Sequence, residues 1–345
     1  MASQIRSEEE VIIDGLDQLK PALMGLEKLV FGGADSETFP TVKVSVDMFD
    51  GTRGAAKYTA RGAKGQTLGL EGWTTEEYQP PMIDERIVIT AEDLEKREKG
   101  KGNINNPASG EEKFQKLINS QLKRKQSGWQ RTYNNQIRDL ITAGKMQVTE
   151  YDDKGNALAP RDIDFKMPST HIYTVDEAWG TDDADIFGDI RAADILIQKD
   201  SGLMPDVAIV GEGALKLMVN DANFMKLLDN RRMKFGELEQ EDMGDGLVKW
   251  GMIGTKTIYT FTDFDEDGAP LIPANSYIPF STRAQTDIYY GSLSTIQNDR
   301  PAIVEATEIM ESDIDRDTVA KIWKFKSAKL YGLTQSAAFA NITVA

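Results

Sequence analysis

Three short stretches of this sequence hold residue types that could bind a ligand or carry out chemistry. The stretch DFDEDG places Asp263, Asp265 and Asp267 at the first, third and fifth positions of a calcium loop, followed by Gly268. That loop closes with a bidentate Glu at its twelfth position, where this chain has Ala274. Because Asp-Gly is also a common turn at a strand reversal, the sequence predicts a turn here rather than a metal site.

The second stretch, VAIVGEGALK, could form a dinucleotide-binding turn. A strand-like run meets Gly211 and Gly213, and a helix-like run follows. The third glycine position of that fingerprint is Lys216, and Glu212 puts a carboxylate between the first two. An ordinary strand-to-helix turn is therefore predicted, with no cofactor.

The third candidate is His171, the one histidine of a chain that has no Cys. A Ser–His–Asp triad would have to use it, but no nucleophile elbow lies near its THIY context. The sequence also has no P-loop and no HExxH motif. We therefore predict a structural histidine and a protein that is not an enzyme.

Composition bounds the class of protein. A chain of 345 residues exceeds what one hydrophobic core usually supports, so two lobes are expected. No apolar run is long enough for a spanning helix, the N-terminus does not read as a signal peptide, and the lack of Cys suits a reducing compartment. The formal net charge of −16 argues against wrapping duplex DNA, which requires neutralising cations.

Apolar spacing predicts the first elements. Apolar residues recur every three or four positions from Ile12 to Val30, which indicates an amphipathic helix or helix pair, docked on its own domain or on a neighbour. Alternation predicts half-buried strands over 41–49 and 83–90. The residues between these strands are too Gly-rich and polar for a core, so we expect a long connection, paired as a projecting hairpin.

A single very long helix is predicted over residues 110–143. Ser109 is a suitable N-cap, and Gly144 follows the last turn. The apolar stripe comprises Phe114, Ile118, Leu122, Trp129, Tyr133, Ile137 and Ile141. At 1.5 Å per residue the helix would be about 50 Å long. Its basic outer face is typical of a solvated surface, with contact to an acidic surface of another chain as the alternative.

The rest of the chain interleaves helices and strands without a regular βαβ period. A hairpin is predicted over 146–165, a helix over 185–199 and a buried strand over 205–210. Short strands are expected across 255–291, and closing strands across 317–344. The fold class is therefore α+β.

Residues 51–70 concentrate basic charge in a chain with 56 acidic and 40 basic residues. This Gly-rich stretch has no Asp or Glu, and its cations are Arg53, Lys57, Arg61 and Lys64. Tyr58 is its one aromatic residue, which disfavours a single-stranded nucleic-acid platform. An acidic surface on a neighbouring copy is the favoured partner, with residues 176–189 or 237–245 as candidates.

Taken in order, these segments resemble the major capsid proteins of tailed phages, which share the Hong Kong 97 fold, and specifically the lambda-type phage major capsid protein E family. Residues 41–90 resemble the family's extended loop and its return strand, and residues 110–145 resemble the spine helix. Residues 205–218 resemble the strand–turn–helix of the axial domain, and residues 313–344 resemble the strands returning to the peripheral domain.

The resemblance implies a division of the chain and a function. The expected parts are an N-terminal arm at 1–39, an extended loop at 40–90, a peripheral domain at 91–175 with the spine helix at 110–143, an axial domain at 176–300, and return strands of the peripheral domain at 301–345. It implies self-assembly into pentamers and hexamers that close an icosahedral head shell around the packaged genome. The implied partners are other copies, a scaffolding protein, the portal and, in some relatives, a decoration protein. The implied location is the virion, and the host cytoplasm during assembly.

Within this resemblance the Gly-rich stretch is the extended loop, and subunit contacts are predicted for Arg53, Lys57, Arg61, Lys64 and Trp73. One alternative is an encapsulin-type compartment with the same fold. An alternative from another class is a soluble enzyme that binds a nucleotide at GEGALK or calcium at DFDEDG, which the absence of a catalytic constellation disfavours.

Overall fold

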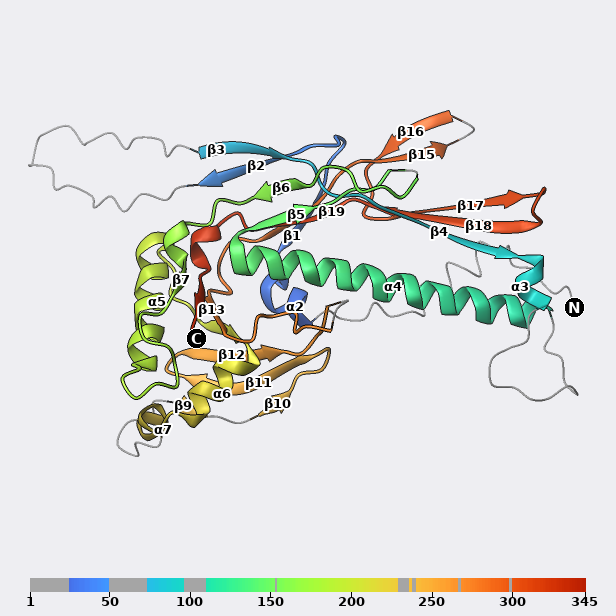
Figure 1. Cartoon of the computed structure of the whole chain (residues 1–345). Coiled ribbons are helices and arrows are strands. Elements are labelled where there is room, and N and C mark those ends of the chain that lie inside the picture. Colours follow the sequence, from blue (N-terminus) through green and yellow to red (C-terminus); the bar gives the residue numbers. More distant parts are fainter. Residues whose placement is uncertain are drawn as a thin grey trace, which may run out of the picture.

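The computed structural model of this chain combines helices and sheets, as the sequence predicts. The structure describes residues 25–49, 73–95, 110–152, 154–228, 236–237, 240–265, 268–297 and 300–345. Two lobes are visible in Figure 1, one built along a long helix and one around a large sheet. We call them the helix lobe and the sheet lobe.

Helix α4 (Gly110–Ala143) is the axis of the helix lobe and has the predicted bounds. Six members of its apolar stripe are buried, from Ile118 to Ile141, and Phe114 is partly buried. The helix ends at Gly144, whose φ of +65° favours glycine. A Cβ there would also lie 2.2 Å from the Cβ of Met167. The predicted cap Ser109 lies outside the described residues.

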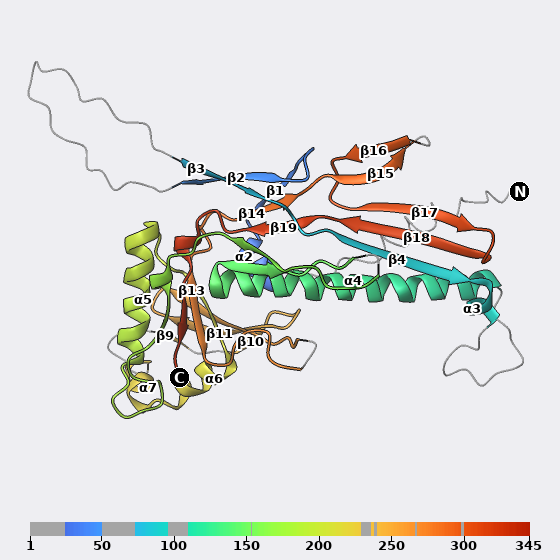
Figure 2. The same ribbon diagram turned by 45° about the horizontal axis from the view of Figure 1, so that its top comes forward.

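A three-stranded sheet lies along α4 in both views (Figures 1 and 2), in the order β17–β18–β4. Its strands are β4 (Ile83–Thr90), β17 (Ile309–Asp315) and β18 (Ala320–Ser327). Ile87 of β4 lies opposite Trp323 of β18, and both are buried. The Trp323 ring packs 5.6 Å from the ring of Phe114 on α4. This sheet therefore buries one face against the long helix.

The strand at 83–90 forms with its predicted bounds but not with the predicted partner. Strand β2 (Val44–Phe49) pairs with β3 (Trp73–Tyr78), whereas β4 pairs with β18. The hairpin therefore returns through 73–78, and residues 83–90 belong to the body. A strand pattern shows which side chains can be buried but does not show which distant strand supplies the hydrogen bonds.

The sheet lobe contains eight strands in the order β10–β11–β12–β8–β13–β20–β7, with β9 also paired to β11. Helix α5 (Ile186–Ser201) begins at the cap Asp185, whose Oδ1 accepts from Gly188 N at 2.9 Å, and it stands beside the C-terminal end of α4 (Figure 2). The strands are β7 (Ile172–Thr174), β8 (Val207–Val210), β9 (Gly236–Glu237), β10 (Glu241–Asp242), β11 (Leu247–Ile253), β12 (Lys256–Phe261), β13 (Ser276–Phe280) and β20 (Asn341–Thr343). The other helices of this lobe are α6 (Glu212–Asn220) and α7 (Ala222–Leu228).

Strand β20 departs from the expectation that 301–345 returns as one unit to the helix lobe. It pairs with β13 and β7 in the large sheet, and Ile342 is fully buried there. Strands β17 and β18 thus belong to the helix lobe, whereas β20, which follows them in the chain, belongs to the sheet lobe.

A segment near the N-terminus connects the two lobes. Helix α2 (Gly25–Phe31) buries Leu26, Val30 and Phe31, and the Phe31 ring lies 4.8 Å from that of Tyr331. A Cβ on Gly25 would lie 3.0 Å from the carbonyl oxygen of Asp245 in the sheet lobe, so α2 approaches that lobe closely. The expected helix positions from Ile12 to Leu23 lie outside the described residues.

The remaining elements complete the helix lobe and its links. They are β1 (Asp35–Thr38), α3 (Ala91–Glu95), β5 (Lys145–Val148), β6 (Arg161–Asp164), β14 (Asp287–Tyr290), β15 (Leu293–Gln297), β16 (Arg300–Val304), β19 (Lys329–Gly332) and the short 3-10 turns at Ser169–His171 and Ser336–Ala338. Strands β1, β14 and β19 form one small sheet. The pair β5–β6 is the hairpin predicted over 146–165, and the pair β15–β16 was not predicted.

Candidate functional site

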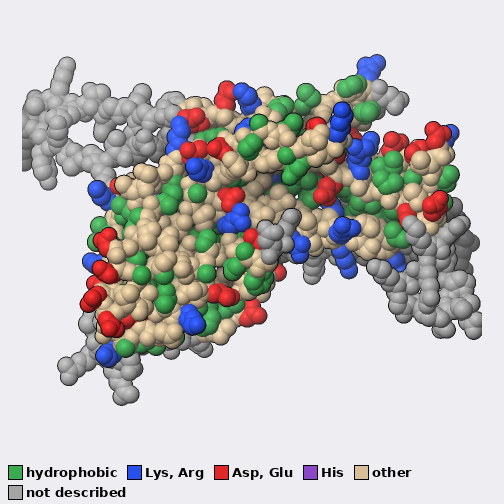
Figure 3. Space-filling model, viewed as in Figure 1, with side chains coloured by type: hydrophobic (Ala, Val, Ile, Leu, Met, Phe, Trp, Pro, Cys, Tyr) green, Lys and Arg blue, Asp and Glu red, His purple; other side chains and the backbone are tan. Residues whose placement is uncertain are grey.

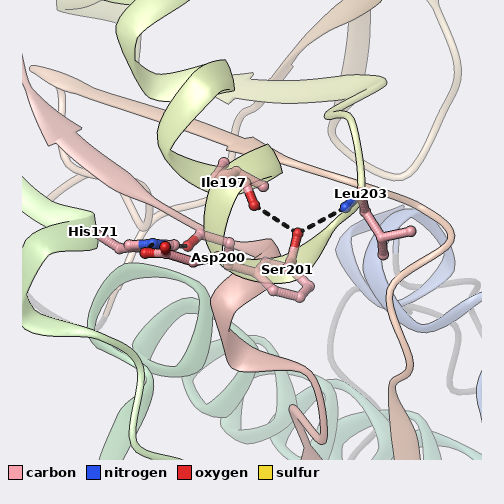
Figure 4. Close-up of polar contacts among 6 residues, drawn as sticks. His171, Ile197, Asp200, Ser201 and Leu203 are labelled. Carbon is pink, nitrogen blue, oxygen red and sulfur yellow. Dashed lines mark hydrogen bonds and ion pairs between the residues drawn. The ribbon is translucent and has the colours of Figure 1, made fainter. Parts of the chain in front are cut away.

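His171 is held inside the protein by two oxygen acceptors. It is fully buried, with Nδ1 2.8 Å from Phe339 O and Nε2 3.0 Å from Asp200 Oδ2. Figure 4 shows that neighbouring Ser201 points its hydroxyl elsewhere: Oγ donates to Ile197 O at 2.7 Å and accepts from Leu203 N at 3.1 Å. The three residue types of a hydrolase triad are thus close in space, but the serine is engaged with its own backbone. His171 joins α5 to the segment before β20, which is the structural role that the sequence predicts.

The glycines of VAIVGEGALK permit close packing of two backbone segments. A Cβ on Gly211 would lie 2.2 Å from Pro273 O, and one on Gly213 would lie 2.6 Å from Asn275 Oδ1. The amide of Ala214 in the first turn of α6 donates to Ala274 O at 2.8 Å. The segment at 273–275 therefore covers the position that a phosphate would need, and the predicted strand-to-helix turn is confirmed.

The stretch DFDEDG also forms the predicted turn. The amide of Gly268 donates to Asp265 O, the amide of Ala269 donates to Asp265 Oδ1 at 2.8 Å, and the φ of Gly268 is +80°. Asp263 Oδ2 accepts from Asn134 Nδ2 of α4 at 3.2 Å, so this carboxylate faces the helix lobe. Asp267 lies outside the described residues. Among the residues that are described, no cluster of three or more His, Asp or Glu side chains could hold a metal ion.

A buried ion pair in the sheet lobe has a structural explanation. Lys256 of β12 lies 2.6 Å from Asp194 of α5 and 2.9 Å from the hydroxyl of Tyr277 on β13. Lys256 and Tyr277 are almost completely buried. The cluster fixes α5 on the large sheet, and all of its members come from elements of the sheet lobe.

In the described part of the chain, no helix is long and apolar enough to cross a membrane.

The β2–β3 hairpin is the feature that the body supports but does not cover. It is directed away from the end of α4 at which α3 lies, as Figures 1 and 2 show. Trp73 begins β3 and pairs with Phe49; its side chain, like Arg53, Lys57, Arg61 and Lys64, lies outside the described residues. The structure thus brings Trp73 to the distal end of the paired strands and leaves the four cations untested.

The base of the hairpin is fixed to the body. Val44 and Val46 are buried, and the Tyr78 hydroxyl donates to Asp164 O at 2.7 Å. The Tyr78 ring packs 4.8 Å from that of Phe165, and burial raises the pKa of Tyr78 well above its usual range. Lys166 forms an ion pair with Glu76 of β3. The base of the projecting β2–β3 hairpin is therefore held on the body by these contacts.

Sequence reasoning missed an apolar surface on β15–β16. Ile296 and Ile303 are 71% and 69% exposed and share one face of this two-stranded sheet with exposed Pro301. The strand pair is fixed to the body, because Thr295 Oγ1 on the opposite face donates to Glu311 and Lys326 Nζ donates to the backbone carbonyl of Ser294. The signal in the sequence is that Leu293 and Ile296 fall on opposite faces, so one apolar residue must be exposed.

These observations define a structural class. The three stretches that could have carried chemistry are all engaged in contacts within the protein. In contrast, the β2–β3 hairpin and the apolar face of β15–β16 point outward from a two-lobed body. Such features belong to a subunit that associates with other subunits.

The comparison with known families agrees with this class. Residues 11–334 match the family described as phage major capsid protein E, and the chain belongs to that family. It is a shell-forming major capsid protein. No curated protein matches the chain.

Solved structures resemble this chain at low sequence identity. The assigned capsid protein of a prophage of E. coli CFT073 has a TM-score of 0.68 and 13% identity, over 97% of this chain and 98% of that one. A phage-related protein of Bordetella bronchiseptica RB50 has a TM-score of 0.50 and 12% identity, over 97% of this chain and 96% of that one. An encapsulin of Synechococcus elongatus PCC 7942 has a TM-score of 0.45 and 8% identity, over 96% and 94%. The family match favours a phage capsid over the encapsulin alternative.

Proposed function

We propose that this capsid protein assembles into pentamers and hexamers that close an icosahedral head shell around packaged DNA, and that it does so without enzymatic activity. The family match over residues 11–334 is the observation that carries the proposal. The engaged state of His171, Ser201, Gly211 and Gly213 supports a structural role for the motifs that could have indicated an enzyme.

The division inferred from sequence is part of this proposal. The helix lobe corresponds to the peripheral domain, the sheet lobe to the axial domain, and the β2–β3 hairpin to the extended loop. A separate scaffolding protein, the portal and, in some systems, a decoration protein complete the expected partners. Assembly takes place in the host cytoplasm.

The extended loop supplies the proposed contact between subunits, through Arg53, Lys57, Arg61, Lys64 and Trp73. Its target is the acidic surface of a neighbouring copy. The segment from 176 to 189 fits that role because its exposed acids lie together around the start of α5: Asp176, Glu177, Asp182, Asp183 and Asp185. A second acidic segment, with exposed Glu241, Asp242 and Asp245, lies beside β11. Opposite charges at the rim of an interface guide association and set its register.

The test reverses the four cations of the loop to Glu. Folding should be nearly unchanged, because exposed substitutions usually shift stability by less than about 0.5 kcal/mol each. Assembly should fail, because a like-charged contact recurs at every subunit of the shell. Circular dichroism and thermal melting measure the fold, and negative-stain microscopy measures particle formation.

A matched control reverses four exposed cations elsewhere, namely Lys154, Lys199, Lys216 and Lys226, and should still give closed particles. Normal particles from the loop variant would overturn the assigned contact. A parent chain that stays monomeric at micromolar concentration, with and without scaffold, would overturn the capsid function itself.

A further inference from the structure

One face of α4 carries positive charge that the helix does not neutralise. Lys123, Arg124 and Arg131 are all exposed, and we call these three residues the basic stripe. At about 100° per residue, their positions fall within an arc of about 100° around the helix axis. Figure 3 shows blue side chains gathered along the course of α4 across the middle of this face.

The helix positions three and four residues before and after each cation of the basic stripe are all uncharged. A helix surface is usually stabilised by acidic residues three or four positions from each Lys or Arg. The positions at those spacings from Lys123, Arg124 and Arg131 hold Asn119, Ser120, Gln121, Gln126, Ser127, Gly128, Asn134 and Asn135. A solvated helix face would be expected to mix both signs of charge, and this one does not.

Other cations of the same helix are paired, which makes the contrast specific. Lys125 forms an ion pair with Glu308, and its Nζ lies 3.8 Å from the centre of the Trp129 ring. Arg138 pairs with Asp139 at 2.7 Å. Lys125 is turned toward the protein and pairs with Glu308, and Arg138 pairs with the adjacent residue of its own helix, whereas the stripe faces outward.

Gly128 leaves the same face of α4 without a side chain at its centre. It is exposed in the middle of α4, and a Cβ added there would meet nothing within 4 Å. Glycine inside a helix costs about 1 kcal/mol relative to alanine. No packing requirement among the described residues explains that cost. The missing side chain leaves space between Arg124 and Arg131 for the close approach of another molecule.

The composition of the face selects the kind of partner. No described residue of α4 is an exposed large hydrophobic, whereas the centre of a protein interface needs apolar or aromatic anchors. Single-stranded nucleic acid needs exposed aromatic platforms, which the described face also lacks. Cations interspersed with Ser, Thr and Asn donors are the groups that contact phosphate oxygens.

We propose that the basic stripe contacts the phosphate backbone of duplex DNA without reading its sequence. The inference rests on the proposed function, in which the shell encloses DNA, and it assigns α4 to the surface that faces that DNA. A stripe of so few cations on a chain of net charge −16 makes a weak, salt-sensitive contact. Such a contact would let the stripe line the inner surface of the shell without immobilising the DNA.

The test measures binding of full-length soluble subunit to a fluorescein-labelled duplex of about 30 base pairs by fluorescence anisotropy. Three neutralised phosphates give a slope of log K against log salt of about −2.7, or about 40-fold weaker binding at 200 mM than at 50 mM salt. The variant K123Q/R124Q/R131Q should lose that slope and at least about ten-fold in affinity at 50 mM salt. The control K154Q/K199Q/K216Q removes the same charge from other exposed positions and should bind like the parent.

Two results would overturn the proposal. One is equal DNA affinity for the parent and both variants. The other is unchanged DNA binding with loss of particle assembly in the stripe variant, which would assign the stripe to an acidic surface of another copy. If the triple variant does not fold by circular dichroism, R131Q alone decides through a loss of about 0.9 in slope. A parent chain that binds DNA but never assembles would contradict the proposed function and leave the stripe's role supported.

Discussion

The Nζ atom of Lys329 lies 2.7 Å from Oε1 of Glu27, although 302 positions separate these residues in the chain. The ammonium also lies 4.8 Å and 4.5 Å from the ring centres of Tyr133 and Tyr331. The pair joins α2 to β19. Burial lowers the pKa of Lys329, and the attraction of Glu27 opposes that shift. Glu27 therefore keeps a buried lysine charged and the N-terminal helix in place.

Replacing Glu27 with Gln should destabilise the protein by about 2 kcal/mol at neutral pH, below the usual cost of breaking a fully buried pair because Glu27 is 24% exposed. Replacing Lys329 with Met in the same chain should recover part of that loss, since no unpaired charge remains. Urea unfolding of the two single variants and the double variant measures the coupling. Strictly additive losses would contradict this assignment.

The loss caused by E27Q should shrink as pH rises from about 7 to about 9. Because the folded pKa of Lys329 is depressed below its ordinary 10.5, the unfolded chain binds more protons between the two values, and stability rises with pH there. Without Glu27 the depression deepens, so this rise begins at lower pH in the variant. A loss that is constant or grows over this range would be inconsistent with a charged Lys329.

Two glycines should respond oppositely to alanine. Gly128→Ala should stabilise the subunit by about 1 kcal/mol, because the Cβ enters open space on a helix. Gly211→Ala should destabilise it by about 2 kcal/mol, because the Cβ would lie 2.2 Å from Pro273 O and 2.4 Å from Ala274 O. Urea unfolding checks both, and an equal response at the two positions would refute the packing argument.

Val319→Asn should stabilise the protein by about 1 kcal/mol. Val319 is a β-branched residue with φ of +48° and 66% exposure in the turn between β17 and β18. The left-handed region costs about 1–2 kcal/mol for such a residue, and Asn tolerates it. Val42, 57% exposed without positive φ, serves as the control, and V42N should change stability by less than about 0.5 kcal/mol. The comparison fails if the two variants respond alike.

His171→Ala should cost about 3 kcal/mol, because it leaves a cavity and removes the partner of Asp200 and of the Phe339 carbonyl. Ser201→Ala loses hydrogen bonds to its own helix and to Leu203 and should cost about 1 kcal/mol or less. Chemical denaturation distinguishes the two. A negligible cost for the histidine variant would remove its structural role.

Local patterns account for much of what could be predicted. The spacing of apolar residues predicted the long helix, and Ser109 and Gly144 predicted its bounds of Gly110–Ala143, because periodicity and capping both depend on neighbouring residues. The turn at Asp265 and the strand-to-helix turn at Gly211 follow from glycine and aspartate chemistry in the same way. The pairing of strands was harder to predict from the sequence. The pattern of 83–90 predicts a strand, but its partner β18 lies more than two hundred positions away.

The sequence by itself determined the α+β class, the long helix and the resemblance to capsid proteins, because each depends on residues close together in the chain or on their order. Only the tertiary structure decided that Lys125 turns inward to Glu308 while Lys123 and Arg124 stay exposed, and that Ile296 and Ile303 remain uncovered. It also decided the pairing of Glu27 with Lys329. The physical reason is that the burial of a side chain and its charge partner depend on which distant segment packs against it. Neither composition nor periodicity specifies that segment.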